Sequence, residues 1–391
     1  MKGSTMLYYC PLEAYKERYT MQWSAPQTGW LERNWIKANI PYTRIDEVKT
    51  LEEPKPITTG CVLDAVGRSQ HCFQQINQLL QLAEEKKITN DDCIYFDDFW
   101  HPGIEALPYA FSLLGIKPKM YAFLHAQSVD EFDFTHPMRS WMRYFEKGIG
   151  KVLDGIFVCG PCLKDLVVFG GIAPSEKVYV TGHPFCSEEV RERMPTQKVK
   201  QREPHIIFSS RWDSEKNPHF FLDVAHAVIK QRPRAKFIVC TSAKTIRSND
   251  PANIQHLKNS TLKYPGNIIL KENLTKEQYY AELWKAKIQM NTADQDFVAI
   301  TLLESSVAGC YPIYPYFRSF PETLRQDSKY MYERLDLNQA TKKVIEILDR
   351  DDLWSEEQIQ QRSWIHTRFD TAWTRMINVM EGKSIDDPYA Y

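Results

Sequence analysis

Two acidic residues, Asp296 and Glu304, enclose a short segment whose backbone could hold an anion. Asp296 precedes an expected helix over 300–308, and Glu304 lies inside that helix. The first N–H groups of a helix have no intrahelical partner, and the helix dipole favours negative charge beside them. Acids at both ends of such a loop can accept hydrogen bonds from sugar hydroxyls on either side of a phosphate. A capped helix with a solvated glutamate is the alternative interpretation. The candidate binding residues between the acids are Phe297, Val298, Ala299, Ile300 and Thr301.

Two basic residues, Arg211 and Lys216, follow an expected strand over 205–209 and precede an expected helix over 219–231. They therefore belong to the carboxyl end of a strand, where two cations can hold a diphosphate. Surface charge beside a turn is the alternative.

Short apolar runs alternate with longer amphipathic stretches along the whole chain, which is typical of an α/β fold. In the first half, helices are expected over 69–86 and 138–153. Strands there are expected over 5–9, 60–64, 94–96, 119–124, 155–158 and 178–181.

The same rhythm restarts after residue 204 and ends in a long helical stretch over 356–381. Further strands are expected over 236–241, 267–271, 288–291 and 311–314, and further helices over 276–285 and 337–349.

A length of 391 residues suits two domains. A polar stretch without apolar periodicity separates the two α/β halves and is expected to be a linker. We therefore predict an N-terminal domain over 1–190, a linker over 191–204, a C-terminal domain over 205–365 and a final helical segment over 366–391. Open parallel sheets bind ligands at the carboxyl ends of their strands, so two such domains would enclose a site in a cleft.

The composition excludes several classes of protein. The chain is 43% hydrophobic and 25% charged, with a net charge of −1, so it is neither a disordered chain nor a polybasic nucleic-acid binder. No apolar run is long enough for a membrane span, and the N-terminus does not match a signal peptide. The nine cysteines lie mostly in apolar segments, which suits reduced thiols in the cytoplasm.

The basic pair and the acid-x7-acid pattern together resemble glycosyltransferase family 4, whose motifs are Gly-Arg-x4-Lys-Gly and Glu-x7-Glu. The resemblance covers roughly residues 205–380 and includes Arg368–Trp373, similar to the family's C-terminal helix. The sequence around Arg211 and around Glu304 is most similar to the tRNA-queuosine mannosyltransferase branch and to bacteriophage enzymes that glycosylate DNA bases. Asp296 departs from the family's glutamate, and the family's N-terminal Gly-Gly loop is absent.

This resemblance implies a GT-B fold, with two Rossmann-like domains facing across a cleft and a C-terminal helix over 366–391 that crosses back to the first domain. The domain over 1–190 would bind the acceptor, and the domain over 205–365 would bind the nucleotide-sugar. It also implies a retaining transfer of a sugar from a nucleotide-sugar, expected to be a UDP-sugar, with no metal and no other cofactor. Arg211 and Lys216 would neutralise the diphosphate, Glu304 would bind the ribose, and Asp296 would contact the sugar. The backbone at 298–301 would bind phosphate or sugar.

Polar residues also follow the expected strands of the first half. Asp97, Asp98 and His101 come after the strand over 94–96. The paired acids could bind a metal or position an acceptor hydroxyl, and an Asx turn with solvated side chains is the alternative. His125 follows the strand over 119–124, and by resemblance it is the first choice for the histidine near the transferred sugar, with a purely structural histidine as the alternative. His183 lies in a loop that resembles the family's loop before the linker, and it is a further acceptor-side candidate.

The segment over residues 11–35 interleaves basic and aromatic side chains directly after the first strand. Such groups suit phosphate contact and stacking on an extruded base, although an amphipathic helix with core tryptophans explains them equally. Similar segments occur in phage glycosyltransferases, which makes Arg18, Tyr19 and Gln22 candidates for acceptor binding.

The sequence thus predicts a glycosyltransferase acting on a hydroxymethylated pyrimidine of phage DNA, in the host cytoplasm. The stretch 191–202 contains five basic residues and one acidic residue, and it could hold the DNA backbone. A tRNA base, a polysaccharide or a small glycoside are alternative acceptors, and a non-catalytic nucleotide-sugar or nucleic-acid binding protein is an alternative class. The Cys159-x-x-Cys162 spacing matches a redox pair, but both flanks continue a larger α/β pattern, which favours a structural role.

Overall fold

The computed structural model describes residues 5–12, 29–45, 65–133, 135–195, 202–325, 328–350 and 356–389. The chain divides into two compact units. Unit 1 contains residues up to Phe185 together with residues from Thr371 onward, and unit 2 runs from Cys186 to Asp370.

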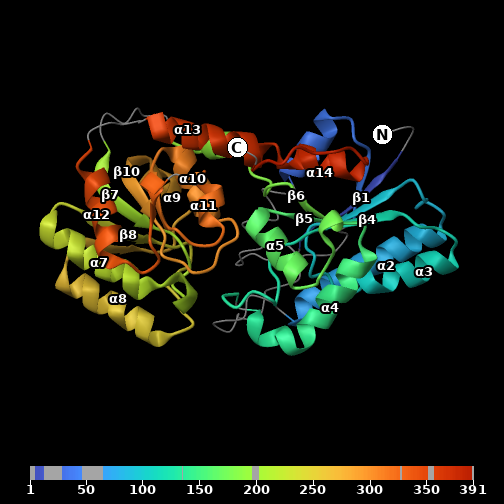
Figure 1. Ribbon diagram of the computed structural model, residues 1–391, viewed down its shortest axis with the longest axis horizontal. Coiled ribbons are helices and arrows are strands. Elements are labelled where there is room, and N and C mark those ends of the chain that lie inside the picture. The colour runs from blue at the N-terminus through green and yellow to red at the C-terminus, as the bar shows by residue number, and fades with distance from the viewer. Residues whose placement is uncertain are drawn as a thin grey trace. The chain divides into compact units, whose positions relative to one another are not determined.

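Unit 1 is built on a parallel six-stranded sheet in the order β2-β1-β3-β4-β5-β6 (Figure 1). Strands β1, β3 and β5 are buried along their whole length, as expected for a parallel sheet covered on both faces. The strands are β1 (Leu7–Cys10), β2 (Tyr42–Arg44), β3 (Cys93–Phe96), β4 (Lys119–Phe123), β5 (Gly155–Val158) and β6 (Val178–Val180).

The helices of unit 1 lie on both sides of this sheet. Figure 1 shows α2, α3 and α4 on one side and α14, at the red end of the chain, on the other. An additional helical segment over 29–37 packs Trp35 edge-on against Tyr9 of β1, with the ring centroids 4.9 Å apart. The helices are α2 (Ala65–Glu84), α3 (Leu107–Leu113), α4 (Arg139–Val152), α5 (Pro161–Phe169) and α14 (Ala372–Met380).

Unit 2 repeats the plan, with a parallel six-stranded sheet in the order β12-β11-β10-β7-β8-β9. Its core gathers Phe208, Trp212, Phe221 and Phe237, whose neighbouring rings lie 4.7–6.2 Å apart. The strands are β7 (Glu203–Phe208), β8 (Lys236–Cys240), β9 (Ile268–Lys271), β10 (Ala286–Met290), β11 (Tyr311–Pro315) and β12 (Met331–Tyr332).

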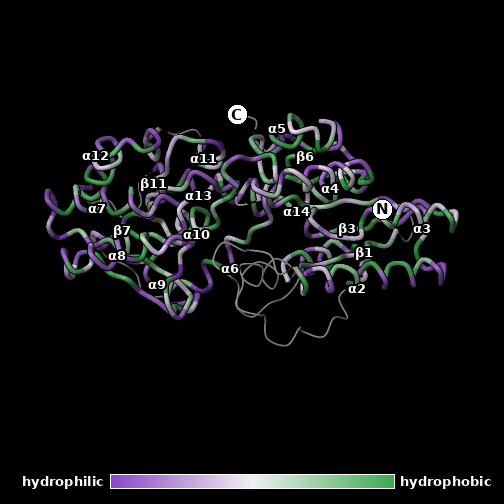
Figure 2. Tube along the Cα trace, turned by 90° about the horizontal axis from the view of Figure 1, so that it is seen from below, coloured by the Kyte–Doolittle hydropathy of each residue, from purple (hydrophilic) through white to green (hydrophobic). Residues whose placement is uncertain are grey.

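The helices of unit 2 also form two layers. On one face α7 contacts both α8 and α12, while α6, α9 and α13 surround α10 on the other. Hydrophilic and hydrophobic residues alternate along helices such as α2 and α3, as Figure 2 shows. The helices of unit 2 are α6 (Ser187–Glu192), α7 (Pro218–Gln231), α8 (Pro251–Lys263), α9 (Lys276–Lys285), α10 (Ile300–Ala308), α11 (Phe320–Thr323), α12 (Leu337–Leu348) and α13 (Glu356–Ile365).

The structure differs from the sequence predictions in several places. Strand β2 and helix α8 were not predicted, and the predicted strand over 60–64 lies outside the described residues. The predicted helix over 356–381 is interrupted by a π-helical turn, His366–Asp370, so that α13 belongs to unit 2 and α14 to unit 1. Within the predicted linker over 191–204, Arg191 and Glu192 end α6, and β7 begins at Glu203.

None of the described helices is long and apolar enough to cross a membrane. The eight cysteines among the described residues form no disulfide. Cys159 is buried and Cys162 is half-buried at the start of α5, where Pro161 is the first helical residue.

Candidate active site

The strand order of unit 2 places a ligand-binding crevice at the carboxyl ends of β7 and β10. From β7 the chain moves outward through β8 and β9, and then returns to the other side of β7 with β10. Such a reversal opens a crevice beyond the carboxyl ends of the two central strands. Arg211 and Lys216 follow β7, and Asp296 follows β10, so the topology itself brings the predicted donor residues together.

Lys216 is the centre of this cluster. Its ammonium group lies 3.0 Å from Oδ1 of Asp296 and donates to the backbone carbonyl of Gln295 at 2.5 Å. The Lys216 side chain is buried, whereas that of Asp296 remains 25% exposed. The structure therefore joins the basic motif and the acidic motif, 80 residues apart in sequence, through one ion pair.

Asp296 has further partners that fix its position. Oδ2 of Asp296 accepts a hydrogen bond from the Asn291 amide at 3.4 Å, and the Ser319 hydroxyl donates to the Asp296 carbonyl. Asn291 also reaches the Ser210 hydroxyl at 3.4 Å, which ties the end of β10 to the end of β7. The carboxylate is therefore held at the crevice rather than left to rotate in solvent.

The start of α10 offers backbone donors next to this carboxylate. Ala299 precedes the helix in an extended conformation, and no side chain caps it. Among the described residues, the N–H groups of Val298, Ala299, Ile300 and Thr301 donate to no protein acceptor. Together with the helix dipole, these groups suit a phosphate or a sugar oxygen. Phe297 is buried, and the Arg318 guanidinium lies 5.8 Å from its ring centroid.

Glu304 lies inside α10 and is buried, with one oxygen occupied by protein groups. Oε1 accepts hydrogen bonds from the Lys276 ammonium at 2.5 Å and from the Tyr280 hydroxyl at 2.9 Å, both on α9. Oε2 accepts none from a described residue. The arrangement leaves one oxygen of a buried carboxylate available for hydroxyl donors.

Arg211 is the most accessible member of the predicted set. Its guanidinium pairs with Asp213 at 2.8 Å and with Glu215 at 2.6 Å, while 46% of the side chain is exposed. An exposed guanidinium can exchange such partners for a phosphate at small cost, because surface ion pairs contribute little.

Sequence reasoning missed several residues that shape the cluster. Lys276 and Tyr280 are four residues apart on α9, so they share one helix face, but nothing in the sequence indicates that this face meets Glu304. Asp294 pairs with Arg334 through two bonds of 2.5 and 2.8 Å, which fixes the loop after β10.

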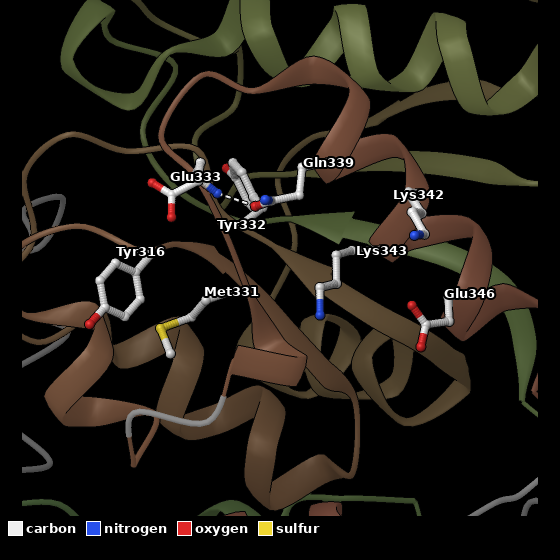
Figure 3. Close-up of a pocket in the computed structure, with 8 residues that line it drawn as sticks. All are labelled: Tyr316, Met331, Tyr332, Glu333, Gln339, Lys342, Lys343 and Glu346. Carbon is white, nitrogen blue, oxygen red and sulfur yellow. Dashed lines mark hydrogen bonds between the residues drawn. The ribbon is translucent and has the colours of Figure 1, made fainter.

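A separate hollow of about 350 Å³ lies at the edge of the same sheet, between β12 and α12. Figure 3 shows Tyr316 and Met331 on one side of it, and Lys343 and Glu346 of α12 on the other. None of the predicted donor residues lines this hollow.

In unit 1 the predicted residues after β3 face internal partners. Asp97 is fully buried and accepts hydrogen bonds from the hydroxyls of Tyr9 at 3.0 Å and Tyr95 at 2.9 Å. Burial raises the pKa of the Asp97 carboxyl. His101 is also buried, 2.8 Å from the Gln75 amide oxygen, and burial lowers the pKa of its imidazole to about 3.

Asp98 is held in a different way. Its carboxylate pairs with the buried Arg68 and accepts the Trp100 N–H at 2.8 Å. Burial alone would raise the pKa of this carboxyl, but Arg68, His125 and the Trp100 N–H together outweigh burial, and the pKa is lowered. Arg68 also donates to the Trp100 carbonyl at 2.6 Å, so the pair fixes the loop after β3.

The two histidines of unit 1 lie side by side. Nε2 of His125 is 2.8 Å from the Asp97 carbonyl, which can only accept, so Nε2 carries a proton. The His183 ring centroid lies 5.8 Å away. Burial and the neighbouring His125 lower the pKa of His183, and its Nδ1 donates to the Pro184 carbonyl at 2.8 Å. His125 is half-buried, whereas His183 is buried.

The remaining acceptor-side candidates, Arg18, Tyr19 and Gln22, lie outside the described residues. Among the described residues, no group of three histidine, cysteine or acidic side chains is arranged to hold a metal ion.

The two units, each with a parallel sheet and helices on both faces, define the GT-B type of fold found in glycosyltransferases. The chain superimposes on sucrose-phosphate synthase of Thermosynechococcus elongatus with a TM-score of 0.68 at 10% identity, covering 97% of this chain and 99% of that one. The UDP-forming α,α-trehalose-phosphate synthase of Burkholderia vietnamiensis gives a TM-score of 0.68 at 11% identity, with the same coverage.

A third similar structure is that of TarM from S. aureus, solved with UDP. It gives a TM-score of 0.59 at 16% identity and covers 78% of this chain, which in turn spans 59% of that chain.

In sequence, a segment of 126 residues is 26% identical to the tRNA-queuosine alpha-mannosyltransferase of Drosophila melanogaster. That segment covers 32% of this chain and 32% of the Drosophila protein, so it spans about a third of that relative's length. No protein-family profile matches the chain.

Proposed function

We propose that this protein is a glycosyltransferase that takes its sugar from a nucleotide-sugar bound by unit 2. The observation that carries the proposal is the Lys216–Asp296 ion pair at the crevice between β7 and β10, beside the open start of α10. A cation, a carboxylate and unused N–H groups at one crevice match the diphosphate and the hydroxyls of such a donor.

In this proposal each donor group meets its chemical complement. Lys216 and Arg211 neutralise the diphosphate, whose negative charge grows as the bond to the sugar breaks. The free oxygen of Glu304 accepts the ribose hydroxyls, and Asp296 accepts sugar hydroxyls. The UDP in the solved TarM structure supports a UDP-sugar as donor.

We further propose retention of configuration at the sugar carbon. The acceptor hydroxyl attacks the anomeric carbon on the face from which the diphosphate leaves, and a phosphate oxygen takes the proton of that hydroxyl. The two cations and the α10 dipole stabilise the leaving group, which is the task that a metal performs elsewhere. In this proposal His125 lies near the transferred sugar.

The proposed acceptor is a hydroxymethylated pyrimidine base in DNA. The candidates Arg18, Tyr19 and Gln22, which are basic, aromatic and amide side chains, follow β1 in the sequence, and the basic stretch 191–202 supplies further positive charge. An enzyme that modifies a base must take it out of the stack, which aromatic side chains support. His183 completes the proposed acceptor side.

A modified base in tRNA is the second candidate. The specific observation in its favour is the similarity of 126 residues to a tRNA-queuosine mannosyltransferase. In both candidates the acceptor is a base in a nucleic acid. The two can therefore be compared in one transfer assay that differs only in the nucleic acid supplied.

The test combines labelled UDP- and GDP-sugars with four acceptor conditions: hydroxymethylated duplex DNA, unmodified duplex DNA, queuosine-containing tRNA, and no acceptor. Label in the hydroxymethylated DNA is the expected result, and the Lys216→Ala variant should lose it. If only the tRNA is labelled, the acceptor is the tRNA base and not the DNA base. Absence of both transfer and donor hydrolysis with every donor would refute the enzyme proposal.

A further inference from the structure

Helix α4 of unit 1 carries four basic residues at intervals of four: Arg139, Arg143, Lys147 and Lys151. Residues four apart lie on the same side of a helix, so these side chains form one stripe. With a rise of 1.5 Å per residue, the stripe is about 18 Å long. One strand of duplex DNA carries about five phosphates over that length.

The stripe is exposed and its charges are not neutralised by the described part of the chain. All four side chains are exposed, and none forms an ion pair with a described residue. Arg143 instead donates to the neighbouring Tyr144 hydroxyl at 2.6 Å. Four cations in a row repel one another. Binding of a polyanion would relieve this repulsion and is therefore favoured.

The acidic residue of this helix, Glu146, does not offset the stripe at the surface. Its carboxylate is buried and accepts the Ser128 N–H and hydroxyl, both at 2.6 Å, and the Trp100 indole N–H at 3.1 Å. These bonds fix α4 to the loops after β3 and β4, which carry Asp98 and His125. The stripe is therefore held rigidly relative to the acceptor-side residues of the same unit.

The carboxyl-terminal half of the stripe borders a hollow of about 560 Å³, lined by Lys147, Lys151 and Lys177. Lys177 donates to the Lys151 and Leu153 carbonyls at 3.1 and 2.6 Å. Glycines form much of the remaining lining, and at Gly150 a Cβ would lie 2.3 Å from the Ile172 carbonyl oxygen. Close packing thus creates a concave surface beside the lysines.

We propose that this stripe on α4 binds the phosphate backbone of duplex DNA and so presents a base to the acceptor side of unit 1. The inference rests on the proposed function, whose acceptor is DNA, and it adds a third contact surface to the two already proposed, the N-terminal segment and the basic stretch 191–202. Unpaired arginines and lysines at the spacing of one helical turn match a regular row of phosphates.

The experiment measures binding of a fluorescent hydroxymethylated duplex by anisotropy over a range of salt concentrations. The test variant replaces the four stripe residues by glutamine. The control variant replaces four exposed basic residues of unit 2 by glutamine, which removes the same charge: Lys230, Arg234, Lys258 and Lys342.

Each phosphate contact contributes about 0.9 to the slope of log K against log salt. The test variant should therefore bind about 10²-fold more weakly than the wild type near physiological salt, with a slope reduced by about 3 to 4. The control variant should stay within a few-fold of the wild type.

Three results would overturn the inference: equal binding by the test variant and the wild type, equal weakening in the control variant, or wild-type binding to anionic vesicles but not to DNA. A thermal melt with and without UDP distinguishes failure of the α4 inference from failure of the proposed function. That stabilisation depends on unit 2, so it should be the same in both variants, and its absence in the wild type would count against the donor site alone.

Discussion

The proposed role of Glu304 leads to a prediction in which both the protein and the ligand can be altered. Glu304→Gln keeps the shape of the side chain but removes its charge. Lys276 and Tyr280 can still donate to the amide oxygen, and Lys276 is partly exposed, so the fold should persist.

The expected loss of UDP affinity follows from Oε2 of Glu304, which accepts no hydrogen bond from a described residue. A hydrogen bond to a charged group contributes about 1.5–3 kcal/mol, because the carboxylate is buried and accepts the donor hydroxyl without competing water. The variant should therefore bind UDP about 10- to 100-fold more weakly than the wild type. Isothermal calorimetry measures this directly.

The ligand supplies the second arm of a double-mutant cycle. The wild type should bind UDP with a ribose hydroxyl removed about 10- to 100-fold more weakly than UDP, whereas the variant should hardly distinguish the two. The matched control is Glu282→Gln, which removes another mostly buried, ion-paired glutamate of unit 2, 2.7 Å from Lys271. A variant that still discriminates ribose from deoxyribose would refute the assignment of Glu304.

Three further predictions concern other residues. Lys216→Ala should lower kcat about 10²- to 10³-fold, whereas Lys329→Ala, which removes an exposed ion pair, should leave kcat unchanged in the same transfer assay. Arg68→Ala leaves the Asp98 carboxylate without its cation in the interior, so urea denaturation should show a loss of about 3–5 kcal/mol, and a much smaller loss would contradict the role of the pair. Burial lowers the pKa of His101 to about 3, against about 6.5 in the unfolded chain, so its contribution to stability is complete above pH 6.5 and is lost as the pH falls towards 3. Between pH 7 and 5 the wild type should thus lose about 2 kcal/mol more than His101→Gln in the same denaturation experiment, and equal losses would contradict a neutral buried imidazole.

Much of the sheet architecture could be predicted from the sequence, because buried parallel strands are continuous apolar runs. β3 and β5 are such runs and were predicted within one residue. β2 was missed because it is a three-residue edge strand, partly exposed, with no apolar pattern. α8 was missed because polar residues dominate it, although Asp250 caps its start.

The donor cluster was predictable only in part. Motif spacing indicated that Arg211, Lys216, Asp296 and Glu304 act together, and the strand order explains why Lys216 reaches Asp296. The partners of Glu304 could not be found, because helix periodicity gives the face that Lys276 shares with Tyr280 but not what that face contacts.

In unit 1 the sequence could not tell an internal carboxylate from a ligand-binding one. Asp97 and Asp98 are adjacent, yet Asp97 accepts two tyrosine hydroxyls and Asp98 pairs with Arg68. Tyr9 and Arg68 come from distant parts of the chain, and only the fold brings them to these carboxylates. The half-buried His125, beside them on the Asp97 carbonyl, remains the acceptor-side residue proposed to meet the sugar.

The central claim is that this chain moves one sugar from a nucleotide-sugar to a base hydroxyl by breaking the bond to the diphosphate. Its most direct test is the stoichiometry of one reaction. Mass spectrometry of the hydroxymethylated DNA should show the mass of one added sugar for each nucleoside diphosphate released, and Lys216→Ala should suppress both. Donor consumed to a nucleoside monophosphate, or diphosphate released with no sugar on any acceptor, would contradict the account.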